Sequence, residues 1–218
     1  DVAGGGGRLL VATPDDVLVG EHGEFLPSDF GCAAAVGVAP DGLFAAAPDG
    51  QVATLDGDQW RTVATVESPR RFDGNLLAAE NGVYRVNAGL DCLGLADVRD
   101  VSRNGPFAAT SDGLHHRTED AWVRVYTGSA VSRVAADERH RLLIDEGRLQ
   151  ICGNGGWVEP TTTIEEEVAD VACGELPYAV TVGGTLLIRG SAGTTADGKA
   201  GWRRSPLGVT GCVALAIA

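Results

Sequence analysis

A short motif that ends in Val-Ala or a close variant recurs along the chain, and this repeat constrains the fold more than any other feature. The central residues of its seven copies are separated by 36, 34, 29, 33, 37 and 42 residues, and they are Val2, Val38, Phe72, Val101, Val134, Val171 and Val213. Self-similarity at intervals of this size is typical of proteins built from repeated supersecondary units. The chain is therefore expected to fold as a series of similar units.

Each repeat contains four short apolar segments separated by turn residues. The motif is followed by an apolar run such as 8–13 (RLLVAT), and turns such as 81–82 (NG) and 112–113 (DG) lead into a third run. Asn-Gly and Asp-Gly tolerate positive φ and favour tight hairpins. Most fourth segments carry an aromatic residue, and these are Phe25, Trp60, Trp122, Trp157 and Trp202. Four short strands per repeat predict an all-β fold, a β-propeller of four-stranded blades.

The number of blades depends on how the end of the sequence is interpreted. Six complete repeats run from residue 1 to about residue 208, and 209–218 (VTGCVALAIA) has the pattern of one further inner strand. We therefore expect a single propeller domain over 1–218 with seven blades, the outer strands of the seventh being supplied by residues that precede Asp1. A six-bladed ring with a surplus strand is the alternative.

Two segments connect the repeats with known propellers. Residues 54–60 (TLDGDQW) and 107–125 (FAATSDGLHHRTEDAWVRV) resemble degenerate Asp-box repeats, in which Ser or Thr, Asp, Gly and Trp close the outer hairpin of a blade. Such repeats occur in sialidase-like and related propellers, and the blade pattern is also WD40-like. Together with the acidic composition, the chain resembles a β-propeller-like family of haloarchaeal proteins. This resemblance extends over the whole chain, and it implies a fold rather than an activity.

The charge of the chain bears on its partners and its location. Thirty acidic residues stand against seventeen basic ones, a formal net charge of −13, and Lys199 is the only lysine. Because nucleic acids and anionic membrane surfaces attract basic patches, we expect neither as a partner. Molar salt screens charge repulsion to about 3 Å, so an acidic, lysine-poor surface fits the cytoplasm of a halophilic archaeon, the interpretation that we favour. A genome of high GC content, which favours Arg and Asp codons over Lys, is the alternative source of this composition.

Charged residues precede the central residue of the motif in four consecutive repeats, in the order Arg71, Asp100, Arg133 and Asp170. Inner strands line the central channel of a propeller, so we predict that these four side chains face the channel. One interpretation is a ring of ion pairs that closes the channel, since buried charges are seldom unpaired. The other is a polar well for a small anion or metabolite, with the two arginines as bidentate donors.

No sequence motif indicates a cofactor, a metal site or a catalytic residue. The leading expectation is a non-catalytic binding or scaffolding module for a protein partner or a small ligand, because the loops of a rigid propeller can vary freely. The alternative is a hydrolase or lyase with its active site at the mouth of the channel.

Overall fold

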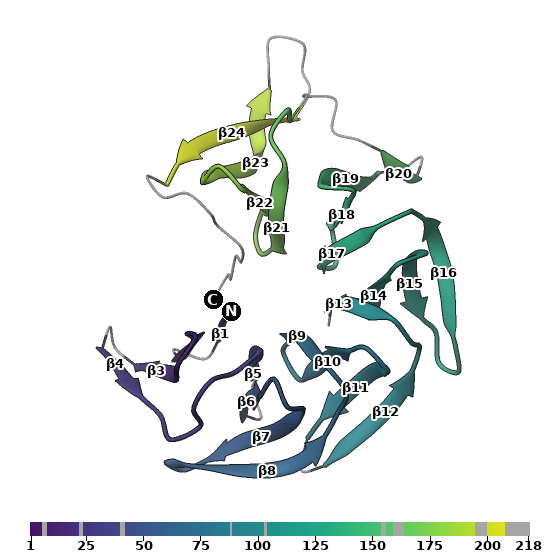
Figure 1. Ribbon diagram of the computed structural model, residues 1–218. Helices are drawn as coiled ribbons and strands as arrows, with labels where there is room; N and C mark the ends of the chain where they lie inside the picture. Colours follow the sequence, from purple (N-terminus) through teal and green to yellow (C-terminus); the bar gives the residue numbers. More distant parts are fainter. Residues whose placement is uncertain are drawn as a thin grey trace.

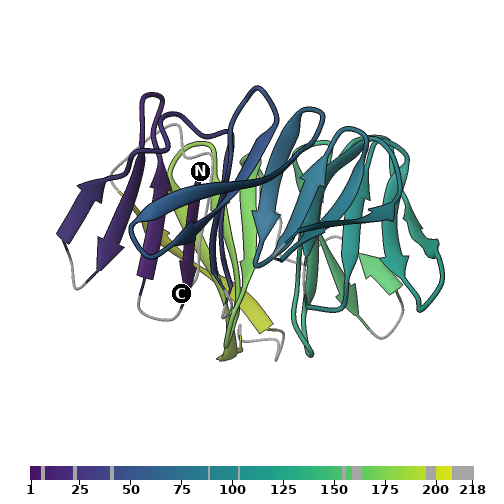
Figure 2. The same ribbon diagram turned by 90° about the horizontal axis from the view of Figure 1, so that it is seen from below.

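The computed structural model describes residues 1–5, 8–21, 24–39, 42–87, 89–102, 104–153, 156–158, 164–194 and 200–207. These residues form 24 strands in six four-stranded sheets, arranged around a central axis (Figure 1). Turning the molecule by 90° shows the sheets standing side by side (Figure 2). Within the described ranges, no helix is long and apolar enough to span a membrane.

Each sheet is one blade, and each blade is built from consecutive strands that pair in an antiparallel manner. Blades 1 to 3 consist of β1 (Val2–Gly5), β2 (Arg8–Ala12), β3 (Val17–Glu21), β4 (Glu24–Pro27); β5 (Ala35–Ala39), β6 (Gly42–Ala46), β7 (Gln51–Asp56), β8 (Gln59–Thr65); and β9 (Pro69–Asp73), β10 (Leu76–Ala79), β11 (Gly82–Val86), β12 (Leu90–Gly94). Blades 4 to 6 consist of β13 (Val98–Ser102), β14 (Phe107–Thr110), β15 (Gly113–Arg117), β16 (Trp122–Thr127); β17 (Val131–Ala136), β18 (Arg141–Asp145), β19 (Arg148–Gly153), β20 (Gly156–Val158); and β21 (Val168–Cys173), β22 (Pro177–Thr181), β23 (Thr185–Thr194), β24 (Ala200–Pro206).

Glycines close the predicted hairpins where the backbone permits no side chain. Gly113, in the Asp-Gly turn between β14 and β15, has a φ of +147°, and a Cβ atom there would lie 2.0 Å from the carbonyl oxygen of Tyr126. Gly50, in the Pro-Asp-Gly turn before β7, has a φ of +98°, and its Cβ would lie 2.0 Å from the carbonyl oxygen of Val66. Other residues at these positions would be strained by both the dihedral angle and the contact.

The hydrophobic core is divided among the spaces between neighbouring blades. Strands β10 and β14 are buried along their whole length, and five clusters of buried apolar side chains each join two successive blades. Phe44 of blade 2 and Phe72 of blade 3, for example, stack with their ring centroids 6.1 Å apart. Burial of apolar area of this kind supplies the main driving force for the ring.

The predicted all-β propeller of four-stranded blades is confirmed, but the preferred count of seven blades is wrong. The described residues form six sheets, and β1 belongs to a first blade that is complete from β1 to β4. The final apolar segment, 209–218, which suggested a seventh blade, lies outside the described residues. A single apolar run resembles an inner strand whether or not a sheet forms around it, so the number of complete repeats was the better guide to the count.

Candidate binding site on the propeller axis

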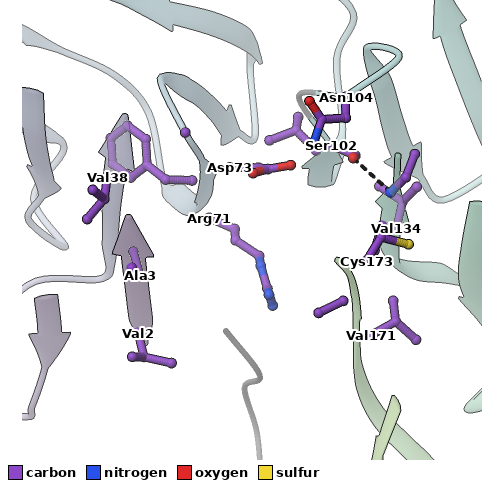
Figure 3. A pocket seen from close by; sticks show the side chains of 17 residues that line it. Val2, Ala3, Val38, Arg71, Asp73, Ser102, Asn104, Val134, Val171 and Cys173 are labelled. Atoms are coloured by element: carbon purple, nitrogen blue, oxygen red, sulfur yellow. Dashed lines mark hydrogen bonds between the residues drawn. The ribbon is translucent and has the colours of Figure 1, made fainter. Parts of the chain in front are cut away.

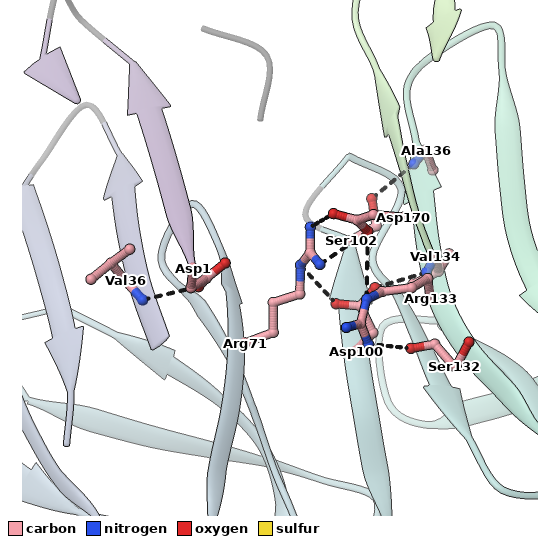
Figure 4. A network of polar contacts seen from close by, with 10 residues as sticks. All are labelled: Asp1, Val36, Arg71, Asp100, Ser102, Ser132, Arg133, Val134, Ala136 and Asp170. Carbon is pink, nitrogen blue, oxygen red and sulfur yellow. Dashed lines mark hydrogen bonds and ion pairs between the residues drawn. The ribbon is translucent and has the colours of Figure 1, made fainter. Parts of the chain in front are cut away.

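The structure brings together all four charged residues that the sequence placed on the channel. Arg71 extends from β9, and its Nη1 and Nη2 atoms lie 3.0 and 2.9 Å from the two carboxylate oxygens of Asp170 on β21 (Figure 4). The Nε atom of Arg71 is 3.4 Å from Oδ1 of Asp100, and the Nε atom of Arg133 is 3.5 Å from Oδ1 of Asp170. Blades 3 to 6 therefore share one network of ion pairs.

A repeated irregularity of the inner strands accompanies these four side chains. In each of blades 3 to 6, the pairing between the first two strands shifts by one residue immediately before the charged position, so that one extra residue is inserted. The described first pairs of blades 1 and 2 show no such shift. Bulges bend a strand and redirect its side chains, so we attribute the convergence of the four groups to them. No signal in the sequence pattern indicates these bulges.

The network is buried and balanced in charge. The side chains of Asp170 and Asp100 are 0% and 1% exposed, and two arginines face these two aspartates. Burial raises the pKa of Asp100 to about 6, although the charges of Arg71 and Arg133 lower it. Burial alone would lower the pKa of Arg71, but the carboxylates of Asp100 and Asp170 raise it above its ordinary value. The ion pairs thus hold each other in their charged forms.

Two of the aspartates that precede the motif also fasten one blade to the next. The Oδ2 atom of Asp100 accepts a hydrogen bond from the backbone N–H of Val134, at 2.8 Å, and Oδ2 of Asp1 accepts one from Val36, at 3.1 Å. In both cases the donor lies on the inner strand of the following blade. These bonds give the acidic residues a structural role beside any role in binding.

A cavity of about 140 Å³ opens beside the network, lined by the later residues of the inner strands (Figure 3). Of the four predicted residues, Arg71 lines this cavity, together with Asp73, Ser102 and Asn104. The volume is comparable to that of an engineered cavity that holds benzene. The cavity could therefore hold a few water molecules or one small polar molecule, and whether the four charged residues bind a ligand stays a prediction.

Cys173 also lines the cavity, and its environment suppresses its reactivity. Burial, with smaller contributions from Asp137 and Asp73, raises the pKa of the Cys173 thiol to about 12. A thiol is nucleophilic only as the thiolate, so this group stays inert near neutral pH. Among the described residues, no group of three or more His, Cys, Asp or Glu side chains is arranged to hold a metal ion.

The segment that resembles an Asp-box forms a local polar cluster at the β14–β15 turn. Asp112 accepts hydrogen bonds from the hydroxyl of Thr110, at 2.6 Å, and from Arg124, at 3.0 Å, and it also pairs with His115. The bonds from Thr110 and His115 lower the pKa of Asp112 to about 2. Asp112 thus stabilises a hairpin on the surface and takes no part in the axial network.

Comparison with known proteins agrees with this architecture. A family model described as "Beta-prop_HVO_0234:-like, beta propeller" matches residues 1–218. A comparison with curated proteins finds no match. Similar solved structures include a chain of a mitotic checkpoint complex (TM-score 0.74, 12% identity, covering 100% of this chain and 80% of that chain) and the WD40 propeller domain of Doa1 (0.72, 12%, 95% and 81%). A third is YCF48 bound to D1 peptide (0.70, 14%, 96% and 81%).

At these identities the solved structures establish the fold alone. The family model, in contrast, covers the whole sequence, as do the repeats from which the propeller was predicted. The chain therefore belongs to the HVO_0234-like beta-propeller family.

Proposed function

We propose that this propeller is a non-catalytic module that binds a protein partner through its outer surface. The observation that carries the proposal is the exposure of β4, the outer strand of blade 1. All four of its residues are exposed, and they include Phe25, at 45%, and Leu26, at 67%. Large apolar side chains that stay in water on an otherwise acidic surface are typical of interaction sites.

The axial network supports the same conclusion, because its charged groups are already paired with one another. The guanidinium of Arg71 is held by two carboxylates, and Asp170 and Asp100 are in turn paired with arginines or bonded to the next blade. These groups stabilise the ring and leave little unpaired charge on the axis for recognition. Two propellers of similar fold were solved in complexes, one with a peptide and one in a checkpoint assembly, which is consistent with a binding role.

Affinity capture tests the proposal. The full chain is used as bait in a lysate of its source cells at their own salt concentration, with an unrelated acidic propeller as the matched control. We expect one protein to be recovered in stoichiometric amount with this chain and not with the control. Recovery of the bait alone, or of the same proteins by both baits, would refute the proposal.

A further inference from the structure

A groove of about 780 Å³ lies between blades 1 and 2 at the rim of the propeller. One wall is formed by β3 and β4 of blade 1, and the other by β7 and the turn that follows it in blade 2. Its volume is within the range of about 300–1,000 Å³ found for ligand sites. Figure 1 shows β4 at the outer edge of the ring.

The contact at the outer end of blades 1 and 2 differs from the one between blades 3 and 4. In blade 4, the Nε1–H group of Trp122 donates to the carbonyl of Leu93 on the preceding outer strand, at 2.9 Å. Trp60 is the corresponding aromatic residue of blade 2, and it packs on Phe30 instead, with ring centroids 5.0 Å apart. Its Nε1 atom is buried and has no hydrogen-bond partner among the described residues. The outer end of the interface between blades 1 and 2 therefore lacks the hydrogen bond that links blades 3 and 4.

The walls of the groove present apolar side chains to each other. Val19 and Leu26 are directly opposed in the pairing of β3 with β4, so their side chains lie on the same face of the sheet. Leu55 contributes from β7 on the other wall, next to Trp60 in the pairing of β7 with β8. An apolar side chain inserted between the walls would contact both blades and would cover Leu26, which is 67% exposed.

The charges of the groove determine what else an occupant must carry. Glu24 lies on the wall of blade 1 and Asp58 on the wall of blade 2, while Arg8 is the one basic residue among the described residues of the lining. Carboxylates on both walls favour a cationic neighbour on each side of the inserted group, and the net charge of the whole chain, −13, has the same sign.

We propose that this groove binds an extended segment of the partner protein in which an apolar side chain is flanked by Lys or Arg. The proposal rests on the proposed function, since it names the surface and the chemistry by which the partner is held. The apolar side chain lies between Val19, Leu26 and Leu55, and the flanking cations face Glu24 and Asp58.

Selection from a phage-displayed library of short random peptides against the immobilised full chain tests this directly. Enriched sequences are then synthesised, and their affinities are measured by fluorescence anisotropy. We expect apolar residues next to Lys or Arg, and we expect L26E to weaken binding by about tenfold or more, since it removes the burial of a leucine side chain. D58K should weaken binding a few-fold, more at low salt than at high salt.

V123E is the matched control, because Val123 is an exposed residue, at 48%, on the outer strand β16 of blade 4. It should change the affinity by less than about twofold, as expected for a residue outside the contact. Equal affinity of the peptides for L26E and wild type would refute binding at the groove while leaving the proposed function intact. Capture of the same partner by L26E and by wild type would have the same consequence. Failure to enrich any peptide, or a dimer of this chain that L26E abolishes, would likewise overturn the proposal.

Discussion

Replacing Arg71 by Met should destabilise the ring, because Arg71 joins blades 3, 4 and 6 through a single side chain. The substitution removes contacts of 3.0 and 2.9 Å to Asp170 and of 3.4 Å to Asp100, and both carboxylates are almost fully buried. Removing one partner of a buried ion pair costs about 3–5 kcal/mol, because it leaves an uncompensated charge. Because Asp170 keeps its ion pair with Arg133 and Asp100 keeps its hydrogen bond from Val134, we expect a loss of unfolding free energy of about 3 kcal/mol, at the lower end of this range.

Equilibrium unfolding in urea at fixed salt measures this loss, followed by tryptophan fluorescence and circular dichroism. The midpoint should fall while the slope of the unfolding free energy with urea stays unchanged. The double variant R71M/D170N provides the control, because it removes opposite charges together and should recover part of the loss. The loss in R71M should also shrink on acidification, because the buried carboxylates that have lost Arg71 are then protonated. A loss below about 0.5 kcal/mol, the range of ordinary surface substitutions, would refute the reasoning.

Four further predictions concern pH, backbone geometry, the tryptophans and salt. Because burial raises the pKa of Asp100 from 3.8 to about 6, the folded state binds a proton that the unfolded state has lost between these values. As the pH rises from 4 to 7, the unfolding free energy of wild type should therefore fall relative to that of D100N, by up to about 3 kcal/mol in total. Equal dependence of the two unfolding free energies on pH would contradict this. G113A should cost more than about 1 kcal/mol in urea unfolding, since its Cβ would meet a carbonyl 2.0 Å away; a neutral effect would show that the turn can relax. W122F should cost about 1 kcal/mol more than W60F in the same assay, because only the Trp122 donor has an acceptor; equal losses would argue against the comparison of the two interfaces. Lowering the salt concentration should lower the thermal midpoint, because repulsion within a chain of net charge −13 is then less screened, and an unchanged midpoint would count against adaptation to high salt.

The sequence predicted the blades well because local signals define them. The Asp-Gly and Pro-Asp-Gly turns require glycine at Gly113 and Gly50, and the apolar runs between turns are short, so few folds other than a propeller fit the spacing. The convergence of Arg71 and Asp170 was harder to predict, because they lie 99 residues apart and on blades that are not neighbours in the chain. Equal spacing from the motif was the signal that placed both on the axis.

Other features could not be predicted, because they depend on how blades meet. The sequence pattern does not distinguish Trp60 from Trp122, since both lie at the start of a fourth strand. Whether the indole finds an acceptor depends on the neighbouring blade, as the bond from Trp122 to Leu93 shows. The groove, too, is formed by residues of two blades, and one of them, Leu55, pairs with Trp60. The one-residue bulges before the charged positions could not be predicted either, because one extra residue within an apolar run leaves the pattern of the repeat unchanged.

The bulges and the groove occur in different blades, and this separation bears on how a partner could bind. Blades 3 to 6 carry the shifted register and share the buried ion pairs, whereas blades 1 and 2 have regular inner pairs and are joined by the bond from Val36 to Asp1. A segment inserted between Val19, Leu26 and Leu55 could therefore displace the outer parts of blades 1 and 2 without straining the contacts of Arg71. Rigid packing on the axis and an open groove at the rim are compatible because they involve different blades. Binding at the groove should accordingly leave the pH dependence of the axial network unchanged.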